Sequence, residues 1–127
     1  MKITILMGSP NKNGSTSILA DEFKRGAEEA GHDCEVIDVC HANIHPCIGC
    51  VACGYEGPCV QKDDVEIIKA KLLSSDMVVF ATPLYYYGMS AHLKAVVDRF
   101  CAYSSSLNSR HLKSALLTVA WNADDWT

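Results

Sequence analysis

The sequence has no long hydrophobic run and no excess of positive charge. No apolar stretch approaches the roughly 20 residues that a membrane-spanning helix needs, and residues 1–7 lack the layout of a signal peptide. The 11 basic residues are outnumbered by 15 acidic ones, so the net charge of −4 offers no electrostatic footprint for nucleic acid. We therefore expect a cytoplasmic protein that binds neither membranes nor nucleic acid.

A further absence concerns catalysis. No Ser–His–Asp arrangement and no pair of carboxylates stands out, so nothing indicates acyl transfer or hydrolysis. No side chain is singled out for proton transfer, and we predict no catalytic residue of that kind. The chain does have 49% hydrophobic and 20% charged residues, a composition typical of globular domains. We predict one domain over residues 1–127, large enough to bury about two-thirds of its unfolded surface without disulfides.

Runs of apolar and β-branched residues alternate along the chain with segments in which apolar residues recur at helical spacing. The runs predict buried strands at 2–7, 33–39, 77–81 and 115–120. Helices are predicted where apolar residues fall on one face, at Leu19, Phe23, Ala27 and Ala30, at Val65, Ile68 and Leu72, and at Leu93, Val96, Val97, Phe100 and Cys101. This order predicts an α/β protein, a doubly wound parallel sheet with helices on both faces.

A polar, glycine-bearing loop joins the first predicted strand to the first predicted helix. Residues 8–17 read Gly-Ser-Pro-Asn-Lys-Asn-Gly-Ser-Thr-Ser. In a doubly wound sheet this turn lies at the carboxyl edge, where a helix N-terminus attracts phosphate. Five residues separate Gly8 from Gly14, so the loop is no Walker A motif, and the dinucleotide fingerprint is absent too. We predict a phosphate site built from hydroxyl groups; the alternative is an ordinary loop that ends in a Ser/Thr helix cap.

A second loop, after the third predicted strand, is aromatic. Residues 82–90 read Thr-Pro-Leu-Tyr-Tyr-Tyr-Gly-Met-Ser. Three consecutive tyrosines cannot all face one core, so some must lie on the surface or against a ligand. The loop shares its sheet edge with the predicted phosphate site, which favours stacking of a flat heteroaromatic ring. A protein–protein contact is the alternative reading, since tyrosines are also enriched at interfaces.

These two loops, followed by Leu-Lys-Ala-Val-Val-Asp-Arg-Phe at residues 93–100, resemble the flavodoxin-like NADPH-dependent FMN reductases. The resemblance covers essentially the whole chain and implies bound FMN. It implies that the FMN phosphate is held by Ser9, Asn11, Lys12, Ser15, Thr16 and Ser17. It also implies that the isoalloxazine ring is lined by Thr82, Pro83, Leu84, Tyr85, Tyr86, Tyr87 and Gly88. The family often has Arg in place of Asn11 and Asn in place of Ser15, so Lys12 is the cation that remains for the phosphate.

Four of the seven cysteines crowd into one glycine-rich loop. Cys47, Cys50, Cys53 and Cys59 have the spacing C-x2-C-x2-C-x5-C. Closely spaced thiolates suit an iron–sulfur cluster, whereas tetrahedral zinc usually takes two separated pairs. The pattern resembles the compact motif of the iron–sulfur flavoproteins, a branch of the same family, which implies a [4Fe-4S] cluster. Zinc and unmetallated thiols or a disulfide remain the alternatives.

The other polar and thiol side chains near these motifs receive structural interpretations. We interpret Cys34, Cys40 and Cys101 as small buried hydrophobes. Neighbouring Asp98 and Arg99 are read as a surface ion pair or an interface contact. The histidines that flank the cysteine loop, His41 and His45, are read as surface residues.

The resemblance predicts an FMN-dependent oxidoreductase. It would move electrons between NAD(P)H or a redox partner and a small-molecule or protein acceptor, with the cluster as a route for single electrons. Two alternatives are a flavodoxin-like electron carrier without a substrate of its own, and a phosphate-ligand binding module with a structural zinc loop.

The length of the chain adds an expectation about its end. A flavodoxin-like sheet of order 2-1-3-4-5 has five strands, and only four are predicted here, so the fifth strand and last helix are expected to be missing. The fourth strand would then be an open edge, which proteins normally pair or cover. We expect either a fragment of a longer protein or a homo-oligomer in which a second chain covers that edge, with Trp121 and Trp126 as contacts.

Overall fold

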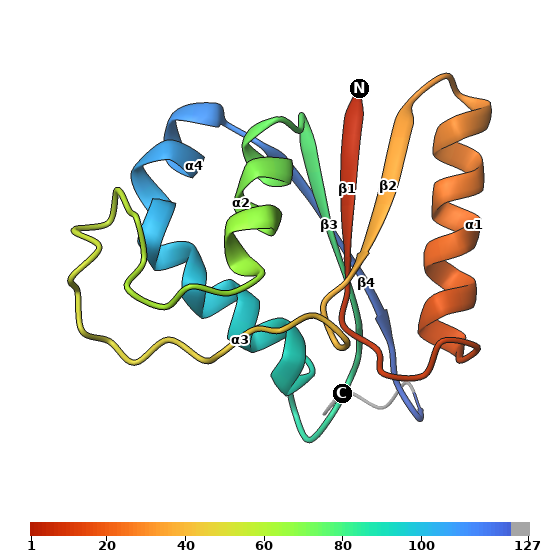
Figure 1. Ribbon diagram of the computed structural model, residues 1–127. Helices are drawn as coiled ribbons and strands as arrows, with labels where there is room; N and C mark the ends of the chain where they lie inside the picture. The colour runs from red at the N-terminus through yellow and green to blue at the C-terminus, as the bar shows by residue number, and fades with distance from the viewer. Residues whose placement is uncertain (123–127) are drawn as a thin grey trace.

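Four parallel strands form the centre of the computed structural model, which describes residues 1–122 (Figure 1). Their order is β2-β1-β3-β4, with bounds Lys2–Met7 (β1), Asp33–Asp38 (β2), Met77–Pro83 (β3) and Lys113–Val119 (β4). The helical segments are α1 (Ser15–Glu29), α2 (Val65–Leu73), α3 (Ala91–Arg99), the 3-10 helix η1 (Phe100–Tyr103) and α4 (Ser104–Arg110). The predicted α/β class and strand order are confirmed.

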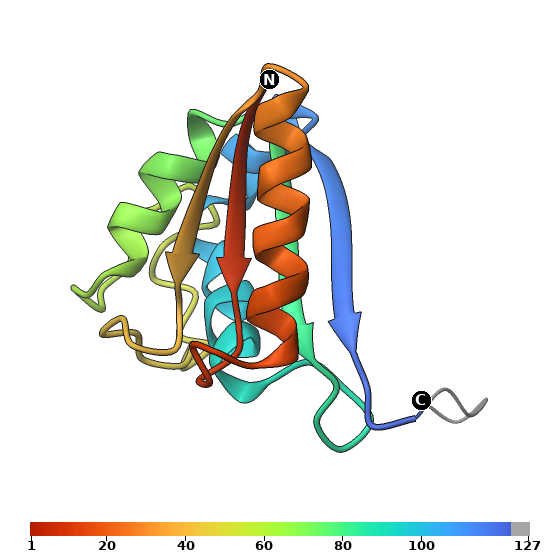
Figure 2. The ribbon, with the colours of Figure 1, turned by 90° about the vertical axis from the view of Figure 1, so that its right-hand side faces the viewer.

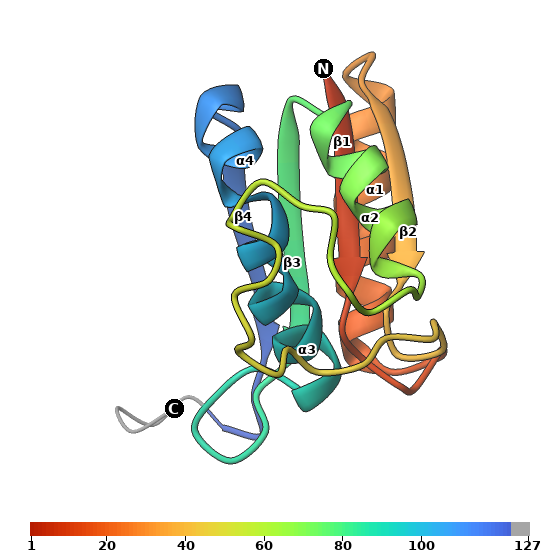
Figure 3. The same cartoon turned by 60° about the vertical axis from the view of Figure 1, so that its left-hand side comes forward.

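Helices cover both faces of the sheet. α1 lies alone on one face, against a core that includes Ile3 and Ile5 of β1 (Figure 2). α2, α3 and α4 lie on the other face, where Leu6, Leu93 and Val96 belong to the second core (Figure 3). Because β1 and β3 are buried on both faces, they read as continuous apolar runs and not as alternating ones.

The topology brings the two predicted binding loops to one edge. Since β1, β3 and β4 are parallel, the segments that follow them all leave the sheet at its carboxyl edge (Figure 1). The chain passes from β1 to β2 on one side, and β3 then pairs with β1 on the other side. Ligands bind at this kind of switch point in doubly wound sheets.

Differences from the predicted boundaries are local. β3 extends through Pro83, two residues further than the apolar run, because its last residues still pair with β4. The third predicted helix ends at Arg99 and continues as η1, so Phe100 and Cys101 do not lie on the α-helix. α4 was not predicted, since its sequence Ser-Ser-Ser-Leu-Asn-Ser-Arg has a single apolar residue and none of its residues is buried.

β4 is an edge strand among the described residues. It pairs with β3 alone, and while Ala115 and Leu117 pack against the α1-side core, the Leu116 side chain is 65% exposed. Trp121 is fully exposed, and Trp126 lies outside the described residues. The expected cover for this edge therefore stays a prediction. Within residues 1–122 we find no helix with the length and apolar character needed to cross a bilayer.

Candidate functional site

The loop after β1 is fixed by its own hydrogen bonds. Ser9 Oγ accepts from the Asn11 N–H at 3.3 Å, and the Asn11 side-chain oxygen accepts from the Asn13 N–H at 3.2 Å. Ser17 Oγ donates to the Asn11 carbonyl at 3.0 Å, which ties the first turn of α1 back to the loop. Ser9 and Ser17 are buried, whereas Asn11 is exposed. These hydrogen bonds join the loop to itself and to the first turn of α1.

The N-terminus of α1 has the features of an anion site. Gly14 precedes the helix, no side chain caps its first N–H groups, and its first turn carries no acidic residue. Those N–H groups and the positive end of the helix dipole favour a bound anion. Lys12 and Ser15 are exposed beside them, while Thr16 is buried. The expected Ser/Thr helix cap of the alternative reading is therefore wrong, and the phosphate site stays a prediction.

Gly8 brings this loop against the start of α3. Its N–H donates to the Ala81 carbonyl at 2.7 Å, at the end of β3. A Cβ on Gly8 would lie 2.8 Å from Leu93 Cβ and 3.0 Å from Ser90 Oγ, distances too short for a side chain. Glycine is therefore required at this position so that the loops after β1 and β3 can lie side by side.

The loop after β3 is held by backbone and hydroxyl contacts. Thr82 Oγ1 donates to the Pro83 carbonyl at 2.8 Å and accepts from the Ser90 N–H at 3.0 Å. Ser90 Oγ in turn accepts from the Leu93 N–H, which makes Ser90 the N-cap of α3. The Leu84 N–H donates to the Val119 carbonyl at 2.8 Å, so the segment after β3 is joined to the end of β4.

Two of the three tyrosines occupy a strained turn. Tyr85 and Gly88 exchange two backbone hydrogen bonds, of 2.9 and 3.0 Å, around Tyr86 and Tyr87. Tyr86 and Tyr87 have φ values of 32° and 65°, in the region that normally favours glycine. Their rings make an edge-on contact with centroids 5.2 Å apart, and Tyr86 is 96% exposed. Backbone strain of this kind is often found at functional sites.

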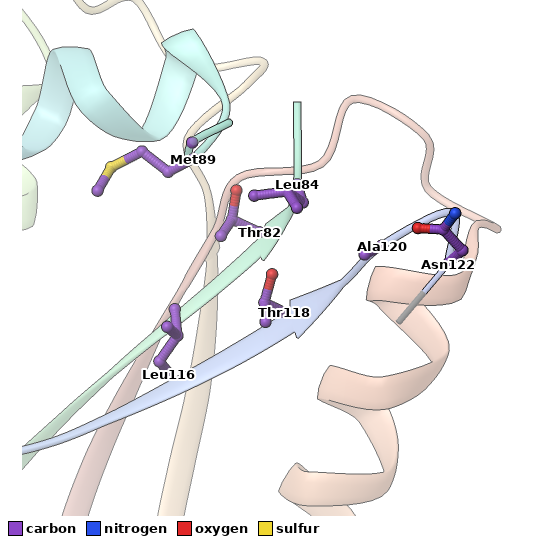
Figure 4. A pocket seen from close by; sticks show the side chains of 8 residues that line it. Thr82, Leu84, Met89, Leu116, Thr118, Ala120 and Asn122 are labelled. Carbon is purple, nitrogen blue, oxygen red and sulfur yellow. The ribbon is translucent and has the colours of Figure 1, made fainter. Parts of the chain in front are cut away.

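A cavity of about 720 Å³ lies between this loop and β4. Figure 4 shows side chains from the end of β3 and from β4 on its walls. Its lining is mostly apolar, with two threonine hydroxyls and one amide, as in sites for flat organic ligands. The lining residues are Thr82, Leu84, Gly88, Met89, Leu116, Thr118, Ala120 and Asn122.

The structure places the predicted ring-binding residues in two groups. Thr82, Leu84 and Gly88 line the cavity, while the three tyrosines and Pro83 do not. The sequence prediction missed the other five lining residues, which are Met89, Leu116, Thr118, Ala120 and Asn122. Because Leu116 lies in an apolar run, the sequence predicts that it is buried in the core. Only the pairing of β4 at the edge of the sheet shows that it faces the cavity.

The cysteine loop between β2 and α2 is irregular and is held at its two ends. Asp63, at its end, accepts from the His45 N–H at 3.0 Å near its beginning. Both terminal nitrogens of Arg99 bond Asp63, at 2.7 and 3.1 Å, and Arg99 also donates to the carbonyls of His45 and Gln61. The side chains of Arg99 and Asp63 are 1% and 0% exposed. This buried ion pair fixes the two ends of the loop to α3.

This finding corrects the surface interpretation of Arg99. Asp98 does lie on the helix surface, where it pairs with Lys94, but Arg99 faces inward and pairs with Asp63. The His45 ring is exposed as expected, although its backbone belongs to the loop-end contacts. Burial alone would raise the pKa of Asp63; hydrogen bonds from Arg99 and from backbone N–H groups outweigh it and lower that pKa to about 2.

The four predicted ligand cysteines line one small cavity. It has a volume of about 30 Å³, and its walls also include Arg99 and Cys101. Cys47 and Cys50 are exposed, Cys53 is half-buried and Cys59 is buried; all are free thiols. Within residues 1–122 no three His, Cys, Asp or Glu side chains are close enough together to hold a metal ion.

The residues around this cavity nevertheless fit an anionic cluster. Thiolates are the ligands that iron–sulfur clusters take. The Nε–H of Arg99 is buried and has no hydrogen-bond partner, although the other two nitrogens of the same guanidinium are bonded. Burial lowers the pKa of Arg99, and the hydrogen bonds and charge of Asp63 outweigh this and raise it. A buried cation with a spare donor suits a site for negatively charged sulfur.

Of the remaining cysteines, Cys34 is buried as predicted, whereas Cys40 and Cys101 are half-buried. Burial raises the pKa of the Cys34 thiol, and burial beside Asp38 raises that of Cys40 to about 11. Thiols with raised pKa values are unreactive. Cys101 is half-buried on η1 and lines the cavity of the other four, so its interpretation as a core filler is wrong.

Fold and loops together define a flavodoxin-like protein with an uncapped helix N-terminus after β1 and an aromatic loop after β3. The chain belongs to the NADPH-dependent FMN reductase family, whose sequence profile matches residues 1–121. It is 35% identical over 103 residues to an iron-sulfur flavoprotein of Archaeoglobus fulgidus, covering 81% of this chain and 47% of that protein. It is 37% identical over 99 residues to an iron-sulfur flavoprotein of Methanocaldococcus jannaschii, covering 78% and 51%.

Solved structures agree on the fold. An NAD(P)H:quinone oxidoreductase from Methanothermobacter marburgensis superposes with a TM-score of 0.80 at 24% identity, over 97% of this chain and 65% of that one. A flavoenzyme NAD(P)H:acceptor oxidoreductase of Paracoccus denitrificans gives a TM-score of 0.68 at 15% identity, over 92% and 59%. The chain spans about half the length of the curated relatives it matches.

Proposed function

We propose that this chain is the FMN-binding part of an oxidoreductase that moves electrons between NAD(P)H or a redox partner and a small acceptor. The observation that carries the proposal is that the loop after β1 and the loop after β3 lie at the same edge of the sheet. The uncapped N-terminus of α1 lies after β1, and an apolar cavity lies beside the aromatic loop after β3. The spacing of these loops across adjacent strands suits a ligand with a phosphate at one end and a flat ring at the other.

The chain's own residues would bind and orient the cofactor. Ser9, Asn11, Lys12, Ser15, Thr16 and Ser17 surround the α1 N-terminus and would hold the phosphate. Thr82, Leu84 and Gly88, with the cavity wall of β4, would hold the ring, and the exposed tyrosines would cover it. Bound FMN would supply the redox chemistry, since flavins exchange two electrons or one at a time.

We further propose that Cys47, Cys50, Cys53 and Cys59 hold a [4Fe-4S] cluster. The support is the shared cavity, the buried Arg99 with its unpaired Nε–H, and the name iron-sulfur flavoprotein carried by similar proteins. Zinc would take the same four thiolates, and metal analysis separates the two.

One anaerobic preparation tests both parts of the proposal. We expect FMN to co-purify and to be released on denaturation, and iron and acid-labile sulfide to be present in equal amounts without zinc. NADPH and NADH are then added separately while flavin absorbance is followed. Protein that binds no FMN after reconstitution would contradict the flavin proposal, and zinc in place of iron would contradict the cluster.

A flavodoxin-like electron carrier is the second candidate. The cavity lining among the described residues includes no acidic, basic or histidine side chain that exchanges protons with a substrate. A carrier needs none, because it passes electrons to a partner protein. Sustained NADPH oxidation with a small acceptor favours the reductase, whereas a flavin that chemical reductants reduce and nicotinamides do not favours the carrier.

A further inference from the structure

Five cysteines, and not four, face the cavity of the cysteine loop. The fifth, Cys101, comes from η1, a separate segment beyond α3. Sequence spacing isolates Cys101 from the motif, because more than forty residues separate it from Cys59. Only the packing of the loop against η1 brings the fifth thiol to the other four.

The part of the loop that packs on η1 is the part that begins at Cys53. The Ser105 N–H donates to the Tyr55 carbonyl at 3.3 Å, immediately after η1. A Cβ on Gly57 would lie 2.9 Å from the Ala102 carbonyl oxygen, so the two backbones are in close contact. The Cys53 carbonyl accepts from the Gly57 N–H at 3.0 Å, which ties Cys53 to this contact.

Exposure to solvent indicates the same neighbour. Cys53 and Cys101 are both half-buried, whereas Cys47 and Cys50 are exposed.

A second feature of the cavity indicates that it receives a ligand. Arg99 lines it with a side chain 1% exposed, and its Nε–H has no partner. Arg99 lies two residues before Cys101, so η1 and the end of α3 supply both a buried donor and a thiol to the same cavity.

We infer that Cys101 is a fifth thiol of the cluster site, placed to take the iron coordination position of Cys53. This inference rests on the proposed cluster. In the exchange, the Cys101 Sγ–Fe bond forms as the Cys53 Sγ–Fe bond breaks; the Cys101 proton goes to solvent and Cys53 takes one up. No electron is transferred, so the step needs neither an oxidant nor a reductant.

The test compares iron and labile sulfide in anaerobically reconstituted variants. Cys53→Ser is expected to keep the iron content of the unchanged protein, because Cys101 replaces the lost ligand, with an altered electron paramagnetic resonance signal after reduction. The double variant Cys53→Ser/Cys101→Ser is expected to lose most of its iron. The matched control Cys53→Ser/Cys40→Ser removes a thiol outside the cavity and should keep the iron of Cys53→Ser.

The other possible results contradict either the inference about Cys101 or the proposed cluster. Loss of iron in Cys53→Ser alone, with a far-ultraviolet circular dichroism spectrum that shows an intact fold, overturns the inference. Full iron in the double variant overturns it as well. An unchanged protein that binds no iron overturns the proposed cluster itself. The alkylation of Cys101 by iodoacetamide gives a second readout: the cluster-loaded Cys53→Ser protein should protect this thiol, and loss of the cluster should expose it.

Discussion

The loop after β1 and the cysteine loop, the two loops proposed to bind ligands, are fixed in different ways. The first is short, and its buried Ser9 and Ser17 fix it in a conformation that leaves the α1 N–H groups available. The second is long, exposed over much of its length, and fixed at its ends by Asp63 and Arg99. The loop after β1, part of the proposed flavin site, is therefore fixed by its own hydrogen bonds, whereas the cysteine loop depends on contacts with distant segments, above all the Asp63–Arg99 pair.

Five left-handed backbone positions add to this contrast. Val51, Tyr55 and three glycines of the cysteine loop have φ values between 56° and 74°. Such conformations are costly for Val and Tyr, and surrounding contacts must maintain them. The loop after β1 has none among its residues. The conformation of the cysteine loop should therefore respond more strongly to loss of its contacts.

Asp63→Asn should have the largest effect, because it leaves the Arg99 cation buried without its anion. Breaking such a pair costs about 3–5 kcal/mol of unfolding free energy, measured by chemical denaturation. The control Asp98→Asn removes a half-exposed pair with Lys94 and should cost less than about 1 kcal/mol. Equal losses in the two variants would show that Arg99 does not secure the loop.

The same pair predicts a pH dependence. The pKa of Asp63 is about 2 in the folded protein, below its ordinary value of 3.8. A carboxyl with a depressed pKa stabilises the fold at pH values above its unfolded pKa, and this stabilisation is lost as the pH falls from about 4 to about 2. The difference in free energy of unfolding between the unchanged protein and Asp63→Asn should become smaller over that pH range. A difference that stays constant down to pH 2 would contradict the assignment.

Gly8→Ala should disturb the other region by a smaller amount. Its methyl group would overlap Leu93 and push the loops after β1 and β3 apart, which costs about 1–3 kcal/mol. FMN affinity should fall with it. Gly26→Ala is the control, since a Cβ there meets nothing within 4 Å; in mid-helix it should stabilise by about 0.5–1 kcal/mol. If both variants bind FMN equally well, the close approach at Gly8 is not needed for the site.

Tyr86→Ala should weaken flavin binding without affecting the fold, because the side chain is 96% exposed. An aromatic stacking contact of about 0.5–1.5 kcal/mol corresponds to a roughly two- to twelvefold loss of affinity for FMN and riboflavin alike. Tyr55→Ala, an exposed tyrosine of the cysteine loop, serves as the control. Unchanged flavin affinity in Tyr86→Ala would favour the protein–protein reading of the aromatic loop.

The sequence predicts the frame of this molecule well and the contacts between distant segments poorly. Strands such as Lys2–Met7 are recognisable because burial on both faces requires continuous apolar residues. The phosphate loop follows from its position after that strand. By contrast, Arg99 and Cys101 lie in a helical pattern that says nothing about their partners. Their roles depend on how residues 43–64 fold back over α3 and η1, which local spacing does not determine.

The central claim is that the loop after β1 holds a phosphate and the loop after β3 holds a flavin ring. The most direct measurement is a titration of the apoprotein with FMN and with riboflavin, which lacks the phosphate, followed by flavin fluorescence. The account predicts that FMN binds at least about tenfold more tightly, since hydrogen bonds to a charged group contribute about 1.5–3 kcal/mol. Lys12→Ala should reduce this preference and Lys24→Ala should not. Equal affinities for FMN and riboflavin in the unchanged protein would contradict the account.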